Sequence, residues 1–272
     1  MANAPEKVRA DKEVVMAAVE KCAFNLMYAA AELQDDKDVV LAAVRELGWT
    51  LAFAPHALQG DKEVVLEAVR RCGSALQFAA SNLQADKEVV LVAARSLHGI
   101  LCMKYAAEGL RSDKEVVIAV VERHPNELRT ASSELRADKE VVLAAVREGG
   151  EALKHAPHAL QGDKDVVQAA VQANGRALEF AAPELRADKE VVLQAVQMAG
   201  CALAFATPAL RGDKEVVMVA VREHRAAFRF AAPELQADEE VRAVAGVQQP
   251  LSHRPTSSTK KLRPSREQSP AG

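Results

Sequence analysis

The sequence predicts an all-α solenoid, and three observations support this fold class. The block Asp-Lys-(Glu/Asp)-Val-Val recurs at a spacing of 25 residues, with a single step of 27. Each copy carries apolar residues at helical spacing, and each is long enough for two short helices. A fixed period of this length is typical of stacked repeats that share one continuous core. The repeated Asp stands at residues 11, 36, 61, 86, 113, 138, 163, 188 and 213.

The first half of each unit predicts one helix. We number each unit from its Asp as position 1, so that unit 1 begins at Asp11 and unit 9 at Asp213. The Asp is expected to cap the helix by accepting hydrogen bonds from free backbone N–H groups, and the acid at position 3 suits the positive end of the helix dipole. Apolar residues at positions 4, 5, 6, 8 and 9 cover a wide arc, as expected for a helix packed between two neighbours.

The second half of each unit predicts a shorter helix over roughly positions 14–20, with apolar residues at 15, 16, 18 and 19. A Gly at position 13 is expected to end the first helix in the left-handed conformation, and a Pro at position 20 or 21 is expected to end the second. Each unit is therefore predicted to be a helical hairpin that is stable only when stacked. The glycines are Gly48, Gly73, Gly150, Gly175 and Gly200, and the prolines are Pro55, Pro157, Pro183, Pro208 and Pro233.

The two ends differ from the regular units, as expected of caps. We expect an N-terminal cap at residues 1–10, which resembles the tail of a unit, and nine units over 11–237. A capping helix is expected over 238–249, where Arg242 replaces the usual Val, followed by a disordered basic tail at 250–272. The longer step in unit 4 places two extra residues around His98-Gly99-Ile100-Leu101, and we expect a bulge in the turn between its helices.

Charge and composition limit the classes of partner. The chain has a net charge of −3, and its tail from Gly246 carries +4, which leaves −7 for the array. An acidic array argues against a general nucleic-acid footprint. No apolar run approaches the roughly 20 residues that span a bilayer, and no secretory segment opens the chain. Four scattered Cys are expected to be free thiols. We therefore expect an intracellular protein, cytoplasmic or nuclear, with no membrane contact.

The recurring pattern Asp-Lys-Glu-Val-Val-Leu-x-Ala-Val, followed by Gly-x-Ala-Leu-x-(Phe/Tyr)-Ala-x-Pro-Glu-Leu, resembles the repeat catalogued as domain of unknown function 4116. That family is described mainly from protists and algae, often in tandem. The resemblance covers about residues 5–245, with departures at Thr130 and His155 in the aromatic column and at Phe228 in the Leu column. It implies a tandem helical-repeat protein, and it implies no activity and no catalytic residue.

No arrangement of residues indicates chemistry. His155 and His158 are three residues apart, but no Cys or acid with metal-ligand spacing accompanies them. Acid pairs such as Asp163 and Asp165 lack the Gly and distal Glu of a calcium loop. There is no Gly-rich phosphate loop and no Ser/His/Asp or Cys/His set. We therefore expect no enzyme, no cofactor and no metal.

Two variable columns are the candidate partner-binding residues. Position 10 holds Arg45, Arg70 and Arg95 in successive units, which would form a basic ladder for an acidic peptide or a phosphate backbone, or else a set of solubilising charges. Position 14 holds Phe24 and Trp49 in units 1 and 2, whereas later units have mostly small or polar residues there. These aromatics are either an exposed interface or a part of the packing against the N-terminal cap.

The function that this pattern favours is a non-catalytic scaffold. Its constant framework would present variable columns, at positions 7, 10, 11, 14 and 17, to an unidentified protein or peptide. The alternative is a nucleic-acid-binding repeat that uses the Arg ladder and the basic tail, and the acidic array opposes it. We expect the chain to be monomeric.

The Lys at position 2 of all nine units calls for a separate explanation, because a cation is unfavourable at a helix N-terminus. We expect it to pair with an Asp or Glu of the following unit. Acids at position 22 (Glu32, Glu134, Glu184 and Glu234) are included among the expected partners.

Overall fold

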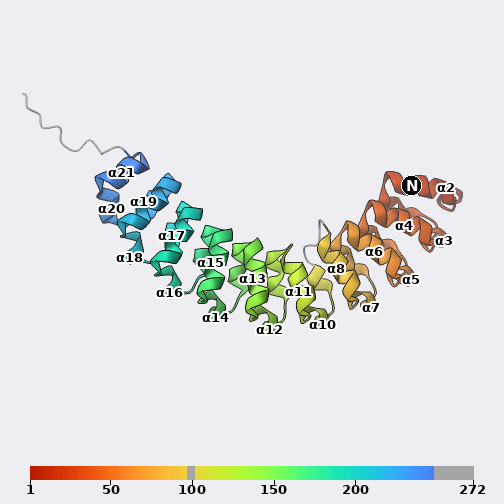
Figure 1. Cartoon of the computed structure of the whole chain (residues 1–272). Helices are drawn as coiled ribbons and strands as arrows, with labels where there is room; N and C mark the ends of the chain where they lie inside the picture. The colour runs from red at the N-terminus through yellow and green to blue at the C-terminus, as the bar shows by residue number, and fades with distance from the viewer. Residues whose placement is uncertain (97–101, 248–272) are drawn as a thin grey trace, which may run out of the picture.

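The computed structural model describes residues 1–96 and 102–247. All regular elements in these residues are helices, and they stack side by side into one curved array (Figure 1). The predicted all-α solenoid is therefore confirmed. The expected disordered tail at 250–272, the last residues of the expected capping helix, and most of the expected bulge in unit 4 lie outside the described residues.

One long α-helix opens each unit, beginning at position 2 directly after the repeated Asp. These helices pack against each other in chain order along one face of the array. They are α2 (Lys12–Lys21), α4 (Lys37–Glu46), α6 (Lys62–Arg71), α8 (Lys87–Arg95), α11 (Lys114–Val121), α13 (Lys139–Glu148), α15 (Lys164–Ala173), α17 (Lys189–Met198) and α19 (Lys214–Glu223).

The repeated Asp caps its helix as the sequence predicts. In unit 3, Oδ1 of Asp61 accepts hydrogen bonds from the backbone N–H groups of Glu63 (3.0 Å) and Val64 (3.2 Å). Val64 and Val65, at positions 4 and 5, are fully buried. The buried residues of successive units form one continuous apolar cluster along the array.

The second half of the unit differs from the predicted single helix. A six-residue 3-10 helix occupies positions 13–18, and a separate short α-helix follows at about positions 21–24. In unit 4, the α-helix α9 (Cys102–Tyr105) takes the place of the 3-10 helix. The 3-10 helices are η1 (Ala23–Tyr28), η2 (Gly48–Phe53), η3 (Gly73–Phe78), η4 (Pro125–Thr130), η5 (Gly150–His155), η6 (Gly175–Phe180), η7 (Gly200–Phe205) and η8 (Arg225–Phe230).

The short α-helices are α3 (Ala31–Gln34), α5 (His56–Gln59), α7 (Ser81–Gln84), α10 (Glu108–Arg111), α12 (Ser133–Arg136), α14 (His158–Gln161), α16 (Pro183–Arg186), α18 (Pro208–Arg211) and α20 (Pro233–Ala237). At the start of the chain, α1 (Glu6–Arg9) occupies the equivalent place before unit 1, and α21 (Glu239–Ala245) follows unit 9.

The prolines mark the start of this third helix rather than the end of the second. Pro183 is the first residue of α16, and Pro55 is the N-cap residue of α5. The fixed φ of proline suits the first turn of a helix, where its missing N–H has no intrahelical partner. An extended residue at position 19, such as Ala181 with φ −71° and ψ 149°, separates the two helices.

The role predicted for the glycines at position 13 is also wrong. Among the described residues, Gly246 is the glycine with positive φ, and Gly150 is instead the first residue of a 3-10 helix. A Cβ built on Gly150 would lie 2.2 Å from the carbonyl oxygen of Ala170 in the next unit. At Gly150, glycine therefore serves the close approach of two units and not a left-handed conformation. Units 1, 5 and 9 have Ala23, Pro125 and Arg225 at this position.

The array is curved, and the short α-helices lie along its convex edge (Figure 1). The turns from the long helices into the 3-10 helices lie along the concave edge, where Gly48 and Gly150 approach the following units closely. The two edges are therefore built from different contacts, with close approaches of backbone to backbone at the concave edge and short α-helices at the convex edge.

The residue at position 24 fastens the short helix to its unit, a role that the sequence did not reveal. Nε2 of Gln59 donates hydrogen bonds to the carbonyl oxygens of Leu51 (3.3 Å) and Ala54 (3.1 Å), near the end of η2. The carbonyl of Gln59 in turn accepts a hydrogen bond from the N–H of Ala80 in the next unit (2.9 Å). This residue therefore satisfies 3-10 carbonyls within its unit and links that unit to its neighbour.

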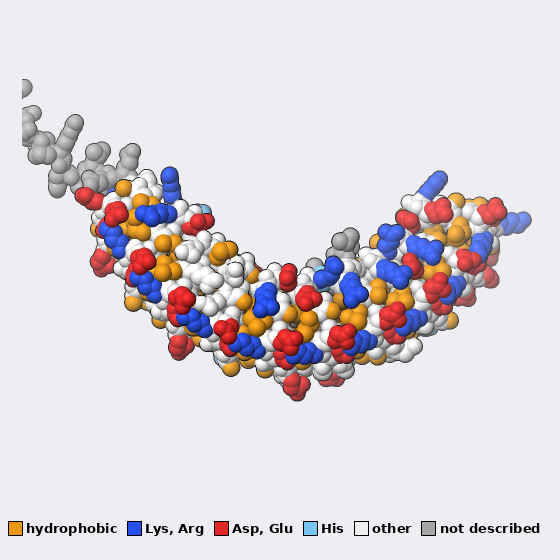
Figure 2. All heavy atoms as spheres, in the orientation of Figure 1, with side chains coloured by type: hydrophobic (Ala, Val, Ile, Leu, Met, Phe, Trp, Pro, Cys, Tyr) orange, Lys and Arg blue, Asp and Glu red, His pale blue; other side chains and the backbone are white. Residues whose placement is uncertain are grey.

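The predicted ladder of inter-unit ion pairs is present at all nine steps from Lys12 to Lys214 (Figure 2). Nζ of Lys62 lies 2.7 Å from Oδ2 of Asp86 and 2.8 Å from Oε2 of Glu88. Each lysine thus contacts the capping Asp and the position-3 acid of the following unit. The acids at position 22 are not its partners in the described residues. From Asp36 to Asp238, Oδ1 of each repeated Asp caps a helix while Oδ2 binds the lysine of the preceding unit.

We expect the triple variant Lys62→Gln, Lys87→Gln, Lys114→Gln to melt a few degrees below the wild type at low salt, because it removes three steps of the ladder. The difference should shrink at high salt, since the pairs are partly exposed and salt screens them. Circular dichroism melting at two salt concentrations measures both effects. A variant that melts at or above the wild-type temperature would show that the lysines contribute no stability.

The ladder also predicts how stability depends on pH. The Lys62 ammonium holds the pKa of Asp86 below its usual 3.8, and Asp86 and Glu88 raise the pKa of Lys62 above 10.5. The stability that the paired Asp86 contributes is fully present above pH 3.8 and is lost as the pH falls below that value. The stability that the paired Lys62 contributes is fully present below pH 10.5 and is lost as the pH rises above that value. We expect the melting temperatures of the wild type and the triple variant to differ most between these limits and to converge as the pH falls below 3.8 and the Asp carboxylates become protonated.

Among the described residues, no helix has the length and apolar character that would let it cross a membrane.

Candidate functional site

The variable positions fall on two faces of the array. Positions 7, 10 and 11 line hollows between successive long helices, as Ala169, Gln172 and Ala173 of α15 do. Positions 14 and 17 lie on the 3-10 helices, which pack behind the long helices and contact them. The position-10 and position-14 candidates therefore sit on either side of the turn at the concave edge.

The three arginines at position 10 are exposed, but they do not form a free basic track. Nη1 of Arg70 lies 2.5 Å from Oε1 of Glu67, and Nε of Arg45 lies 3.8 Å from Oε2 of the same residue. Arg95 has no ion pair with any residue that the structure describes. In unit 5, position 10 holds the acidic residue Glu122 instead of an arginine. One glutamate, Glu67, thus contacts two of the three arginines, and its single negative charge offsets half of their combined charge.

Phe24 and Trp49 are partly exposed, by 47% and 44% respectively, and each also packs against the following unit. The Phe24 ring meets Phe53 edge-on at 6.1 Å, and the Trp49 ring meets Phe78 in the same way at 5.4 Å. Nε1 of Trp49 lies 3.0 Å from Sγ of Cys72. These contacts hold the aromatic rings in place while leaving nearly half of their surface open.

The sequence analysis missed the extent of this surface. Met27, at position 17, is 43% exposed, and positions 14, 17 and 18 of units 1–3 contain no charged residue. We call these residues the N-terminal apolar patch. The members are Phe24, Met27, Tyr28, Trp49, Ala52, Phe53, Ser74, Gln77 and Phe78.

The same columns in later units differ in charge. Units 4, 5, 6, 7 and 9 each carry at least one charged residue there, and only unit 8 does not. In unit 9, Arg229 covers the ring of Phe230 at 4.5 Å, and in unit 4 Lys104 covers Tyr105 at 5.4 Å. In units 2 and 3 the position-18 ring is covered by an aromatic ring instead. Comparing position 17 between units would have revealed this contrast from the sequence.

The described residues contain no group of three or more His, Cys, Asp and Glu placed to hold a metal ion. His155 and His158 line one shallow hollow, and burial lowers the pKa of His155 below 6.5. Burial, with a smaller contribution from Glu127, raises the pKa of the Cys102 thiol to about 12. A thiol with this pKa is protonated at neutral pH and is a poor nucleophile.

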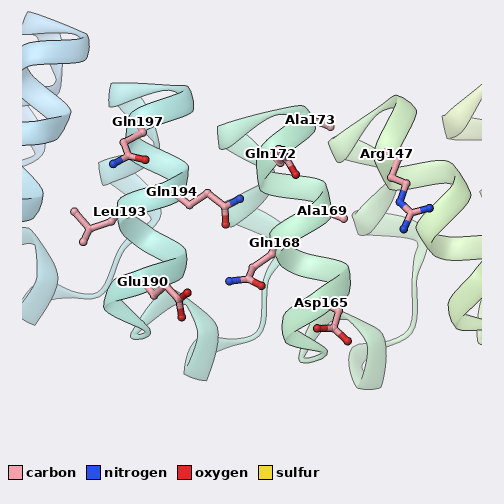
Figure 3. Close-up of a pocket in the computed structure, with 10 residues that line it drawn as sticks. All are labelled: Arg147, Asp165, Gln168, Ala169, Gln172, Ala173, Glu190, Leu193, Gln194 and Gln197. Atoms are coloured by element: carbon pink, nitrogen blue, oxygen red, sulfur yellow. The ribbon is translucent and has the colours of Figure 1, made fainter.

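One hollow extends across α15, from Arg147 of α13 to α17, and its lining includes four glutamines (Figure 3). The sequence analysis singled out none of them. Related hollows occur between α11 and α13 and near α8, but their linings include several charged residues, such as Glu122 and Glu140.

A comparison with protein-family models matches the Domain of unknown function (DUF4116) over residues 11–59, 61–98, 138–186 and 188–236, which is more than half of the chain. The chain belongs to this family. Three of the four DUF4116 matches span two units each, so the family model describes a pair of the 25-residue units found here. The unmatched stretch from 99 to 137 begins within the 27-residue step from Asp86 to Asp113. Comparisons with curated proteins and with solved structures give no match.

Proposed function

We propose that this DUF4116 protein is a non-catalytic scaffold that binds another protein through its variable surface columns, chiefly through the N-terminal apolar patch. The observation that carries this proposal is the combination of partly exposed aromatic residues with the absence of charge in units 1–3. Exposed Trp and Phe residues held in fixed positions are typical of interface hot spots, since they bury a large apolar area at little cost in side-chain entropy.

The charges at the two ends of the array favour a monomeric scaffold. The N-terminal end presents Asp11 and Glu13, which have no lysine of a preceding unit to bind. The C-terminal end has Glu239 at the position where other units have the ladder lysine. Two chains stacked end to end would therefore bring like charges together. We further propose that the scaffold acts inside the cell, in the cytoplasm or the nucleus, and its four free cysteines suit a reducing compartment.

Nucleic-acid binding through Arg45, Arg70 and Arg95 is less well supported, because Glu67 pairs with two of these arginines. A filter-binding titration against RNA and DNA at two salt concentrations tests this alternative. Binding that weakens steeply with salt and is lost in an Arg70→Ala, Arg95→Ala variant would favour it over the protein scaffold.

We expect Trp49→Ala to weaken partner binding about tenfold or more while lowering the free energy of unfolding by only about 1 kcal/mol, since the ring is partly exposed but stacks on Phe78. Proteins captured from the source cell by the wild type and the variant can be compared quantitatively. Arg176→Ala, at position 14 of unit 7, is the matched control and should retain every partner. A stability loss of roughly 3–5 kcal/mol would instead make Trp49 a core residue.

A further inference from the structure

On the long-helix face, units 7 and 8 differ from every other unit. Positions 7, 10 and 11 carry at least one charge in each of the other seven units and none in these two. Figure 2 shows the corresponding area over α15 and α17 as a gap in the blue and red side chains. The uncharged residues are Ala169, Gln172, Ala173, Gln194, Gln197 and Met198.

The hollow that extends across α15, from Arg147 of α13 to α17, coincides with this uncharged area. It has a volume of about 820 Å³, within the roughly 300–1,000 Å³ of ligand-binding pockets. Ala169 and Ala173 leave room on the side of α15 that faces Arg147 of α13, and Gln194 extends from α17 toward α15 (Figure 3). Gln168 also lines it, at position 6, where the other units have Leu, Met or Ile. The volume and the four amides together define a groove.

The amide groups of this groove are available for a ligand. Gln168, Gln172, Gln194 and Gln197 make no hydrogen bond with any residue in the described part of the chain. The glutamines at position 24, such as Gln59, donate to carbonyl groups of their own 3-10 helix. Each free amide offers two N–H donors and a carbonyl acceptor.

The charged residues at the ends of the groove leave little net charge there. Asp165 lies 2.8 Å from Nζ of Lys139, and Glu190 lies 2.6 Å from Nζ of Lys164, so both acids at one end are engaged in the ladder. Arg147 is the single cation among the lining residues. A phosphate backbone would meet one positive charge beside two carboxylates. An uncharged ligand would lose little binding free energy to these charges.

We propose that this groove binds an extended, uncharged peptide segment through its backbone. An extended peptide presents N–H and C=O groups in alternation, and glutamine amides can bond to both. Met198, the residue after Gln197 on α17, is 51% exposed and offers an apolar surface for the side chains of the peptide. The groove lies on the long-helix face of units 7 and 8, and the N-terminal apolar patch lies on the 3-10 helices of units 1–3. An experiment can therefore disprove the proposal for one site without affecting the proposal for the other.

The test uses random dodecapeptides displayed on phage and selected against the full chain. Selected sequences should be predominantly uncharged, and synthetic versions should bind in a fluorescence titration. The double variant Gln172→Leu, Gln197→Leu keeps the side-chain size but removes two amides, and it should weaken binding about tenfold or more. N-methylation of the peptide backbone should have a similar effect. Arg222→Leu, at position 10 of unit 9, is the matched control and should bind as the wild type does.

Three outcomes would overturn the proposal: no sequence is enriched, the enriched peptides are mainly charged, or they bind the double variant and the wild type equally well. An oligonucleotide that competes with the peptide would also overturn it. The altered side chains are exposed, and a circular dichroism melt of the variant establishes that a loss of binding does not arise from unfolding.

Discussion

Gly150→Ala should lower the free energy of unfolding by about 3 kcal/mol, the upper end of the usual range for overpacking. The added Cβ would lie 2.2 Å from the carbonyl oxygen of Ala170 and 3.1 Å from Cβ of Ala177. The first of these atoms belongs to the backbone of α15 and cannot rotate away. The interface between units 6 and 7 must therefore open. Urea denaturation followed by circular dichroism measures the loss.

Gly109→Ala provides the control for this prediction. Gly109 lies inside the short helix α10, and a Cβ at that position would have no atom within 4 Å. Alanine is favoured over glycine in a helix by roughly 0.5–1 kcal/mol, so stability should rise slightly. Equal losses for the two variants would mean that the glycines at position 13 are not required by close contact between units.

Glu127→Ala should raise the free energy of unfolding by about 1–3 kcal/mol, because it removes a buried carboxylate that is poorly paired. Glu127 is 3% exposed and stands at position 15, which is a fully buried Ala in five other units. Its Oε1 accepts one long hydrogen bond of 3.4 Å from Nη2 of Arg129. Its Oε2 has no hydrogen-bond partner in the described part of the chain. Thermal melting of the two proteins measures the gain.

Arg129→Ala tests the same explanation from the other side of the pair. Among the described residues, Arg129 supplies the one side chain that bonds to the buried carboxylate, so its removal should lower stability, whereas Glu127→Ala should raise it. The double variant should be as stable as Glu127→Ala alone, since Arg129 then has no partner to lose. A lower stability for Glu127→Ala would show that the carboxylate has a favourable role in unit 5.

The sequence identified part of the candidate sites. Phe24 and Trp49 stood out because their column is small or polar in most other units, and both are partly exposed. The arginines at position 10 stood out by the same reasoning, yet Glu67 pairs with two of them. That pairing joins Arg45 of one unit to position 7 of the next, and column variation within units does not reveal such contacts. The glutamines of units 7 and 8 were overlooked because uncharged amides match no chemical motif.

By itself, the sequence determined the repeat, the long helix with its Asp cap, the buried apolar columns and the pairing of each lysine with the next unit. All of these follow from local spacing, because a capping Asp acts within one turn and an apolar arc defines the buried face. Tertiary structure decided that a 3-10 helix and a short α-helix follow, and that Gly150 serves close contact rather than a left-handed turn. It also decided which variable columns share a face. These features depend on contacts between residues about 25 positions apart, where the carbonyl of one unit limits the space left for its neighbour.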